Sequence, residues 1–139
     1  MFQRTLPVRA LACGACALLL TACASTAFQP RDLTGQVSYK EKITLPPAST
    51  MVHLRLMNVA GSGGAADLLA EQFIDQPAHF PVRFDLRYDQ HAIVAGGRYE
   101  LDTQVYSEHQ LSMQTAQTLT PGSSGLPDSV DVTVTPVGK

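Results

Sequence analysis

Apolar and polar residues alternate strictly along several short segments of the chain. In residues 80–88 every even-numbered position is apolar and every odd-numbered position is polar or proline. The same period of two recurs in residues 52–56, 99–105 and 130–134. Because successive side chains of a strand point to opposite faces, this pattern predicts strands that are buried on one face.

The remaining segments give weaker signals. A first strand is expected over residues 33–39, continuing to Ile43 with Glu41 out of phase, and residues 69–74 and 111–118 are further strand candidates. The best helical candidate, residues 65–72, is short. Gly, Pro and Ser punctuate the breaks between segments, at residues 45–47, 60–64, 96–97 and 121–127. We therefore expect an all-β fold, an antiparallel immunoglobulin-like β-sandwich of about seven strands, with a small barrel as the alternative.

The first 22 residues follow a different pattern. Arg4 and Arg9 precede an apolar stretch over residues 10–20, which is the arrangement of a secretory signal peptide and is too short for a stable membrane span. The stretch ends in Leu-Thr-Ala-Cys at residues 20–23, which resembles the bacterial lipobox at all four positions. The resemblance implies cleavage before Cys23 and acylation of its thiol and new amino group. The alternatives are a plain signal peptide cut after Ala22 or Ala24, or a short buried helix.

The predicted anchor determines where the protein is expected. Several acyl chains hold a protein on a membrane permanently, whereas one chain does so only marginally. Ala24 follows Cys23 where an Asp would favour retention in the inner membrane, so we expect the periplasmic face of the bacterial outer membrane. Residues 23–32 are then the lipidated Cys and a tether, of which residues 24–32 span about 30 Å when extended. The β-sandwich domain is expected over residues 33–139.

Composition and charge agree with one small exported domain. The chain has 139 residues, of which 45% are hydrophobic, a share too high for disorder. Removing Arg4 and Arg9 from ten Lys and Arg leaves eight cations against twelve Asp and Glu, a formal charge of −4 for residues 23–139, which excludes a basic nucleic-acid binder. Cys13 and Cys16 lie in the predicted signal peptide, so no disulfide is expected in the mature domain.

Several blocks of the chain form a characteristic series. They are a strand end over residues 37–44, a Leu-Pro-Pro corner at residues 45–47, the strand over residues 52–56, and the Phe-Asp-Leu-Arg-Tyr-Asp strand end at residues 84–89, followed by Tyr-Glu-Leu at residues 99–101. This series resembles the YbaY/YscW family of small bacterial lipoproteins. The resemblance covers roughly residues 33–105. Two positions depart from the family pattern: Arg87 replaces a usual Pro, and Asn58 replaces a frequent Asp.

The resemblance implies a β-sandwich outer-membrane lipoprotein. Some members of this family act as pilotins or chaperones for the secretins of type III secretion systems, which implies binding to an envelope protein partner. The resemblance therefore implies a protein-binding, chaperone-like or pilotin-like module.

The residues that could bind a metal or act as nucleophiles are scattered. His53, His79, His91 and His109 never occur at metal-ligand spacing, and His53 and His109 are expected at solvent-facing strand or loop positions. We therefore predict no metal site and no cofactor. Residues 61–64 lack the Lys-Ser/Thr ending of a phosphate-binding loop and are expected to form a hairpin turn. Ser123 and Ser124 lie outside any nucleophile elbow.

Carboxylates lie two or four positions apart on two of the predicted strands. Asp85 and Asp89 form one such pair, and Glu100 and Asp102 form the other. Glycoside chemistry could use carboxylates on a shared face. Cross-strand ion pairs are the favoured interpretation, with the arginines at positions 83, 87 and 98.

Two turn positions have a structural interpretation. Asp89 is expected to form a turn by accepting hydrogen bonds from backbone N–H groups two residues on. Pro46 and Pro47 are expected to hold the corner between the first two strands, because proline restricts φ and donates no ladder hydrogen bond.

No catalytic constellation emerges from these residues, so the chain is predicted not to be an enzyme. The favoured function is a lipid-anchored module that binds an envelope protein through its sheet surface or an edge strand, without nucleic acid. The alternatives are an envelope enzyme or glycan-binding protein, and a structural lipoprotein without a specific ligand.

Overall fold

The computed structural model describes residues 26–60 and 65–138, and these residues fold as seven strands with two short 3₁₀ turns. The elements in chain order are β1 (Pro30–Tyr39), η1 (Pro47–Ser49), β2 (Thr50–Asn58), β3 (Asp67–Asp75), β4 (Val82–Asp89), η2 (Gln90–Ala92), β5 (Tyr99–Ser107), β6 (Gln110–Leu119) and β7 (Ser129–Pro136). Each segment predicted from alternation coincides with a strand, which confirms the all-β prediction. Residues 65–72 contribute to β3 and are not helical.

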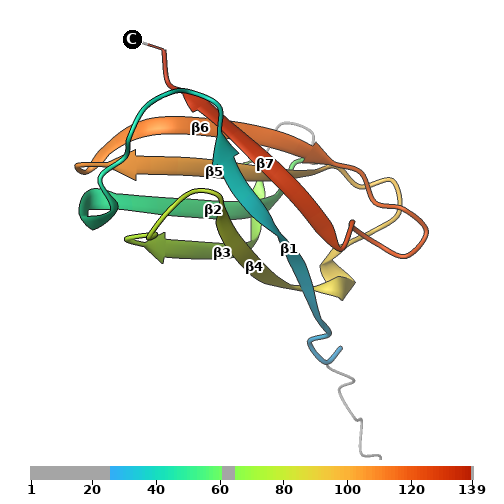
Figure 1. Ribbon diagram of the computed structural model, residues 1–139. Coiled ribbons are helices and arrows are strands. Elements are labelled where there is room, and N and C mark those ends of the chain that lie inside the picture. Colours follow the sequence, from blue (N-terminus) through green and yellow to red (C-terminus); the bar gives the residue numbers. More distant parts are fainter. Residues whose placement is uncertain (1–25, 61–64, 139) are drawn as a thin grey trace, which may run out of the picture.

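The strands form one continuous series in the order β3-β2-β5-β6-β7-β1-β4. Figure 1 shows two layers, one with β3, β2, β5 and β6 and the other with β7, β1 and β4. The layers join where β6 and β7 share only two residue pairs, Met113 with Pro136 and Gln114 with Thr135. On the opposite side, the side-chain oxygen Oε1 of Gln72 in β3 accepts a hydrogen bond from the backbone N–H of Asp85 in β4, at 3.2 Å. The fold is therefore a nearly closed, barrel-like arrangement.

Two details differ from the sequence-based expectation. β1 and β7 pair in parallel, so the sheet is mixed and not wholly antiparallel. β1 also begins at Pro30, within the expected tether, and ends at Tyr39 without continuing to Ile43. The strand begins early because residues 30–32 find ladder partners in β4, where Pro30 lies opposite Asp89 and Asp32 opposite Arg87.

The core lies between the two layers. Every strand except β3 contributes fully buried apolar side chains, and Leu69, Ala70 and Ile74 of β3 are partly buried and pack against them. Along β4 the inward side chains Val82, Phe84, Leu86 and Tyr88 are buried, as the alternation predicts. The other buried apolar residues are Leu33, Val37, Val52, Leu54, Leu56, Tyr99, Leu101, Val105, Met113, Leu119, Leu126, Val130, Val132 and Val134. This single cluster stabilises both layers together.

The two ends of the molecule differ in what they carry. In Figure 1, η1 and the β5–β6 hairpin lie at one end, and the start of β1 with η2 lies at the other. Gln29, just before β1, donates its backbone N–H to the Asp89 carboxylate at 3.1 Å and accepts a backbone hydrogen bond from Gln90 at 2.8 Å. The N-terminal segment is therefore attached at the η2 end.

Candidate binding face

The outward side chains of the four-stranded layer form a continuous face, which we call the β2 face. Along β2 its residues are Met51, His53, Arg55 and Met57, all half-buried. Cross-strand pairing aligns each of them with a residue of β3 and a residue of β5: Asp75 and Tyr106 beside Met51, Phe73 and Gln104 beside His53, Glu71 and Asp102 beside Arg55, and Leu68 and Glu100 beside Met57. Rows of neighbouring side chains therefore cross the face from β3 to β5.

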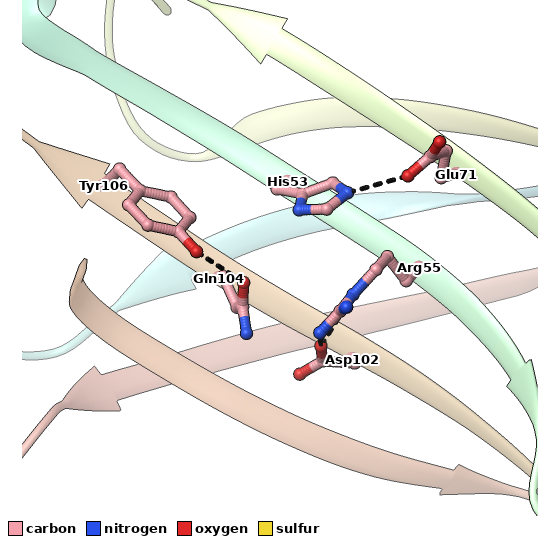
Figure 2. Close-up of polar contacts among 6 residues, drawn as sticks. All are labelled: His53, Arg55, Glu71, Asp102, Gln104 and Tyr106. Carbon is pink, nitrogen blue, oxygen red and sulfur yellow. Dashed lines mark hydrogen bonds and ion pairs between the residues drawn. The ribbon is translucent and has the colours of Figure 1, made fainter. Parts of the chain in front are cut away.

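His53 of β2 contacts two residues of β3. Its ring stacks on Phe73, with the centroids 4.0 Å apart and the planes inclined by 12°. Its Nε2 lies 3.1 Å from Oε2 of Glu71 (Figure 2). These contacts leave only 13% of the His53 side chain exposed. His53 therefore points away from the core, as expected, but neighbouring side chains cover most of its ring.

Polar contacts fix the middle of the β2 face. Arg55 donates from Nε to Oδ2 of Asp102 at 3.0 Å, and its terminal nitrogen also donates to Oδ2 of Asp102 (Figure 2). Both side chains are partly buried, so the solvent screens this pair less than a fully exposed one. The Tyr106 hydroxyl donates to Oε1 of Gln104 at 2.8 Å. The face is thus ordered before any partner binds.

Large apolar side chains remain accessible on the β3 side of this face. Phe73 is 53% exposed and Leu68 is 50% exposed, although both lie within β3. The outer face of the other layer is polar, with residues such as Thr34, Asp85 and Asp131 at its outward positions. The apolar surface of the strands is therefore concentrated on the β2 face.

A pocket of about 470 Å³ lies at the η1 end of the β2 face. Its lining includes Ser49, Met51, Asp75, Gln76, Tyr106 and His109. Met51, Asp75 and Tyr106 form one cross-strand row of the face, so the pocket continues the face without a break.

Backbone hydrogen bonds hold the walls of this pocket. Glu108 donates its N–H to the Ser49 carbonyl at 3.0 Å, and Gln76 donates its N–H to the Thr50 carbonyl at 2.9 Å. Gln76, Glu108 and His109 all have positive φ. This conformation is uncommon for residues other than glycine, and such residues persist where the surrounding structure holds them. The pocket rim is therefore held in a defined shape.

Cross-strand ion pairs occur as predicted, but with different partners. Asp102 pairs with Arg55, whereas Arg87 pairs with Asp32 of β1, with Nε 2.8 Å from Oδ1. Hydrogen bonding to Arg87 lowers the pKa of Asp32 below its usual value. Arg83 and Arg98 form no ion pair within the described residues. The partners differ because they depend on which strands are neighbours.

The predicted turn role of Asp89 is confirmed. Its Oδ1 accepts the backbone N–H of His91 at 3.0 Å and caps η2, and the same oxygen accepts the N–H of Gln29. The hydrogen bond from His91 is the main cause of a lowered pKa for this carboxyl, and the bond from Gln29 acts in the same direction. Asp89 therefore joins the end of β4 to the segment that precedes β1.

The prolines at residues 46 and 47 form the corner between β1 and β2. Pro46 and Pro47 introduce η1, and the Pro46 carbonyl accepts the Thr50 hydroxyl at 2.7 Å. Asn58, at a position where the family often has Asp, accepts the backbone N–H of Ala60 through its side chain at 3.1 Å.

Other candidates from the sequence lie apart from the β2 face or outside the described residues. Ser123 and Ser124 line a separate pocket with His91, near the start of β1. Cys13, Cys16, Cys23 and the loop of residues 61–64 lie outside the described residues. Within the described part of the chain, no cluster of three or more His, Cys, Asp or Glu side chains has metal-binding geometry. None of its helices is long and apolar enough to cross a membrane.

The β2 face could not be recognised as a site from the sequence alone. Phe73 belongs to the weakest part of the alternating pattern, and Met51 precedes the segment recognised as a strand. The only available signal was a large apolar residue at an outward position, and isolated exposed apolar residues are ordinary. Pairing with neighbouring strands is what gathers them.

Comparisons with known proteins support a particular family. Residues 29–134 match the family model described as type III secretion system lipoprotein chaperone (YscW), which is a chaperone family and not an enzyme class. The structure of an alternative pilotin from the type II secretion system of Vibrio cholerae is similar in fold, with a TM-score of 0.69 and 24% sequence identity, over 80% of this chain and 100% of that chain.

A 9R-lipoxygenase from Cyanothece aligns less well, with a TM-score of 0.39 and 19% identity, over 76% of this chain and 16% of that chain. A comparison with curated proteins found no significant match. The family model covers most of the chain and nearly all of the described strands, and the chain belongs to the YscW family of type III secretion system lipoprotein chaperones.

Proposed function

We propose that this protein is a lipid-anchored chaperone of the pilotin type, which binds an envelope protein such as a secretin at the periplasmic face of the outer membrane. The family match supports a protein-binding chaperone, and the similar fold of the Vibrio cholerae pilotin agrees with it. The lipobox at residues 20–23 supports the anchor. The protein then acts by binding and not by turnover.

The observation that carries this proposal is the β2 face. It presents Phe73 and Leu68, each about half exposed, beside a preformed pocket, while the other layer has a polar outer face. Exposed apolar side chains rimmed by polar groups are typical of protein-binding surfaces.

The proposed anchor and the β2 face are compatible in space. From Cys23 to Gln29 an extended chain spans about 20 Å, so the η2 end stays close to the membrane. The pocket is lined in part by Ala48 and Ser49 of η1. In Figure 1, η1 lies at the opposite end of the molecule from the start of β1. Tethering raises the effective concentration of the domain toward membrane-resident partners to about the millimolar range, so a modest affinity is sufficient.

The experiment compares the wild type with Cys23→Ala, expressed in cells that assemble a secretion-system secretin. Radiolabelled palmitate should enter the wild type only, and crosslinking should capture the secretin with the wild type and far less with the periplasmic variant. Palmitate on Cys23→Ala would contradict the lipidation site. Equal capture by both forms would contradict a role for the anchor, and capture by neither would contradict the proposed partner.

A further inference from the structure

Two loops at the η2 end of the molecule contain no charged residue. Residues 93–97 join η2 to β5, and residues 120–127 lie between β6 and β7. Both loops line a pocket of about 370 Å³ together with Gln29, so they are neighbours of the segment before β1. At the other end, the loop before η1 holds two lysines and a glutamate at residues 40–42, and Glu108 lies beside η1. Because charged groups are costly to remove from water, the η2 end can leave water more readily.

Two large apolar side chains are exposed at the η2 end, on different segments of the chain. Phe28 lies just before Gln29 and is 59% exposed, and Val94 lies in the loop that follows η2 and is 57% exposed. No other large apolar side chain of the described residues is as exposed as these two. Contact with an apolar environment would therefore be favourable for this end of the domain.

Hydrogen bonds hold Val94 in its exposed position. Its backbone N–H donates to the Tyr99 hydroxyl at 2.8 Å, and the same hydroxyl donates to the Ala92 carbonyl at 3.2 Å. The N–H of Gly97 donates to the Val94 carbonyl at 3.1 Å. Tyr99 is buried, so these bonds attach the loop to the core. Val94 is therefore presented by an ordered turn, and a contact made through it requires little further ordering of the loop.

The proposed anchor brings the η2 end to the lipid surface. From Cys23 to Phe28 an extended chain spans at most about 18 Å. Gln29 accepts a backbone hydrogen bond from Gln90 of η2 at 2.8 Å, and β1 begins at Pro30. The tether is therefore attached at the end of the molecule whose loops lack charge.

The charged groups near the two loops are compatible with a lipid surface. Arg31 pairs with Asp128 at 2.7 Å, and the Asp89 carboxylate accepts two backbone N–H groups. Arg98 follows the first loop, is exposed, and forms no ion pair within the described residues. Anionic lipid headgroups attract such a cation.

We propose that the η2 end of the domain lies on the surface of the bilayer, with Phe28 and Val94 at the boundary between headgroups and acyl chains and Arg98 at the level of the headgroups. The contact orients the domain, with η1 on the side away from the membrane. This inference rests on the lipid anchor of the proposed function and adds a second membrane contact, made by the folded domain itself.

The test places a single tryptophan in the acylated mature protein, because the chain contains none. Val94→Trp is the diagnostic variant, since residue 94 is far from Cys23 in the chain and reaches lipid only if the domain lies on the bilayer. The protein is reconstituted in vesicles of phosphatidylethanolamine and phosphatidylglycerol, with ordinary or brominated acyl chains. Brominated lipid should quench at least about half of the Val94→Trp fluorescence, because interfacial contacts reach about 5–10 Å into the headgroup and acyl boundary.

Matched variants carry the tryptophan at other exposed apolar positions. Ile43→Trp, in the loop before η1, and Phe73→Trp, in β3, replace side chains that are 46% and 53% exposed. Brominated lipid should quench each of them by less than about one tenth. Phe28→Trp is the positive control for access to lipid, because the tether alone keeps residue 28 near the bilayer.

A charge reversal tests the cation at the headgroups. Arg98→Glu, introduced into Val94→Trp, should lower the quenching by brominated lipid about twofold, because anionic headgroups repel the new carboxylate. Arg83→Glu makes the same charge change in β4 and should leave the quenching unchanged. Circular dichroism checks that every variant is folded.

Other results would overturn the inference. Equal quenching of Val94→Trp and Ile43→Trp would show that the domain has no fixed orientation on its tether. Blue-shifted emission of Val94→Trp in ordinary vesicles, without quenching by brominated lipid, would identify a second copy of this chain as the occupant of the η2 end. A wild type without palmitate would contradict the anchor in the proposed function. If the wild type is acylated and captures a secretin while Val94→Trp is not quenched, only the membrane contact of the domain is wrong.

Discussion

Gly35 of β1 leaves no room for a side chain beside Val130 of β7. A Cβ atom added to Gly35 would overlap the Val130 carbonyl oxygen and lie 2.9 Å from Cε1 of Phe84 in β4. Gly35 lies opposite Val130 in the parallel pair and opposite Phe84 in the antiparallel pair. The missing side chain thus lets three strands approach one another.

Gly35→Ala should therefore destabilise the fold strongly. Backbone atoms of β7 must move to admit the methyl group, and we expect a loss of about 3 kcal/mol or more in the free energy of unfolding. Equilibrium urea unfolding followed by circular dichroism measures this. Gly122→Ala is the control, because the nearest atom to an added Cβ is 3.8 Å away, and it should change stability by less than about 0.5 kcal/mol. Equal effects of the two substitutions would contradict the close approach.

Phe84→Ala should lower the free energy of unfolding by about 3–5 kcal/mol, because it leaves a cavity in the core. Phe84 is 4% exposed, between the two layers. Phe73→Ala removes an aromatic ring that is 53% exposed and should cost less than about 1 kcal/mol. If Phe84→Ala does not fold, Phe84→Leu should still do so, with a loss below about 3 kcal/mol. A cost of less than about 1 kcal/mol for Phe84→Ala would contradict its inward position.

Thr103→Val should stabilise the protein. The Thr103 hydroxyl is buried in β5 and has no hydrogen-bond partner among the described residues. Replacing it with a methyl group removes an unsatisfied polar group at nearly constant shape, and we expect a gain of up to about 1 kcal/mol. Thr50→Val is the matched control, because its buried hydroxyl donates to the Pro46 carbonyl, and it should cost about 1 kcal/mol. Thermal unfolding of both variants checks the opposite signs, and a destabilised Thr103→Val would contradict the unsatisfied hydroxyl.

Asp89 should make stability depend on acid pH. Its pKa is lowered in the folded state by hydrogen bonds from the backbone N–H groups of His91 and Gln29, so folding favours the charged form. Its contribution is therefore present above the unfolded pKa of about 3.9 and is lost as the pH falls through the lower folded value. Asp89→Asn should be less stable than the wild type near pH 6, and the difference should shrink below about pH 4. Urea midpoints measured at several pH values check this, and a constant difference would contradict the role of the carboxylate.

Alternation along the chain was sufficient to predict β2, β4, β5 and β7 and their buried faces. Residues 82, 84, 86 and 88 all point inward, because a period of two determines which face each side chain joins. Local chemistry also predicted the turn at Asp89, since its hydrogen bond to His91 spans only two residues. The family, too, was recognised from short blocks of sequence.

The tertiary structure decided which strands are neighbours. The parallel pairing of β1 with β7, the Arg55–Asp102 ion pair and the pocket beside Met51 all join segments that are far apart in the chain. Ladder hydrogen bonds connect backbone groups that every non-proline residue carries, so alternation specifies a face without specifying a partner strand. The packing of the two layers around one core determines which strands pair. This pairing in turn brings together the residues of the β2 face.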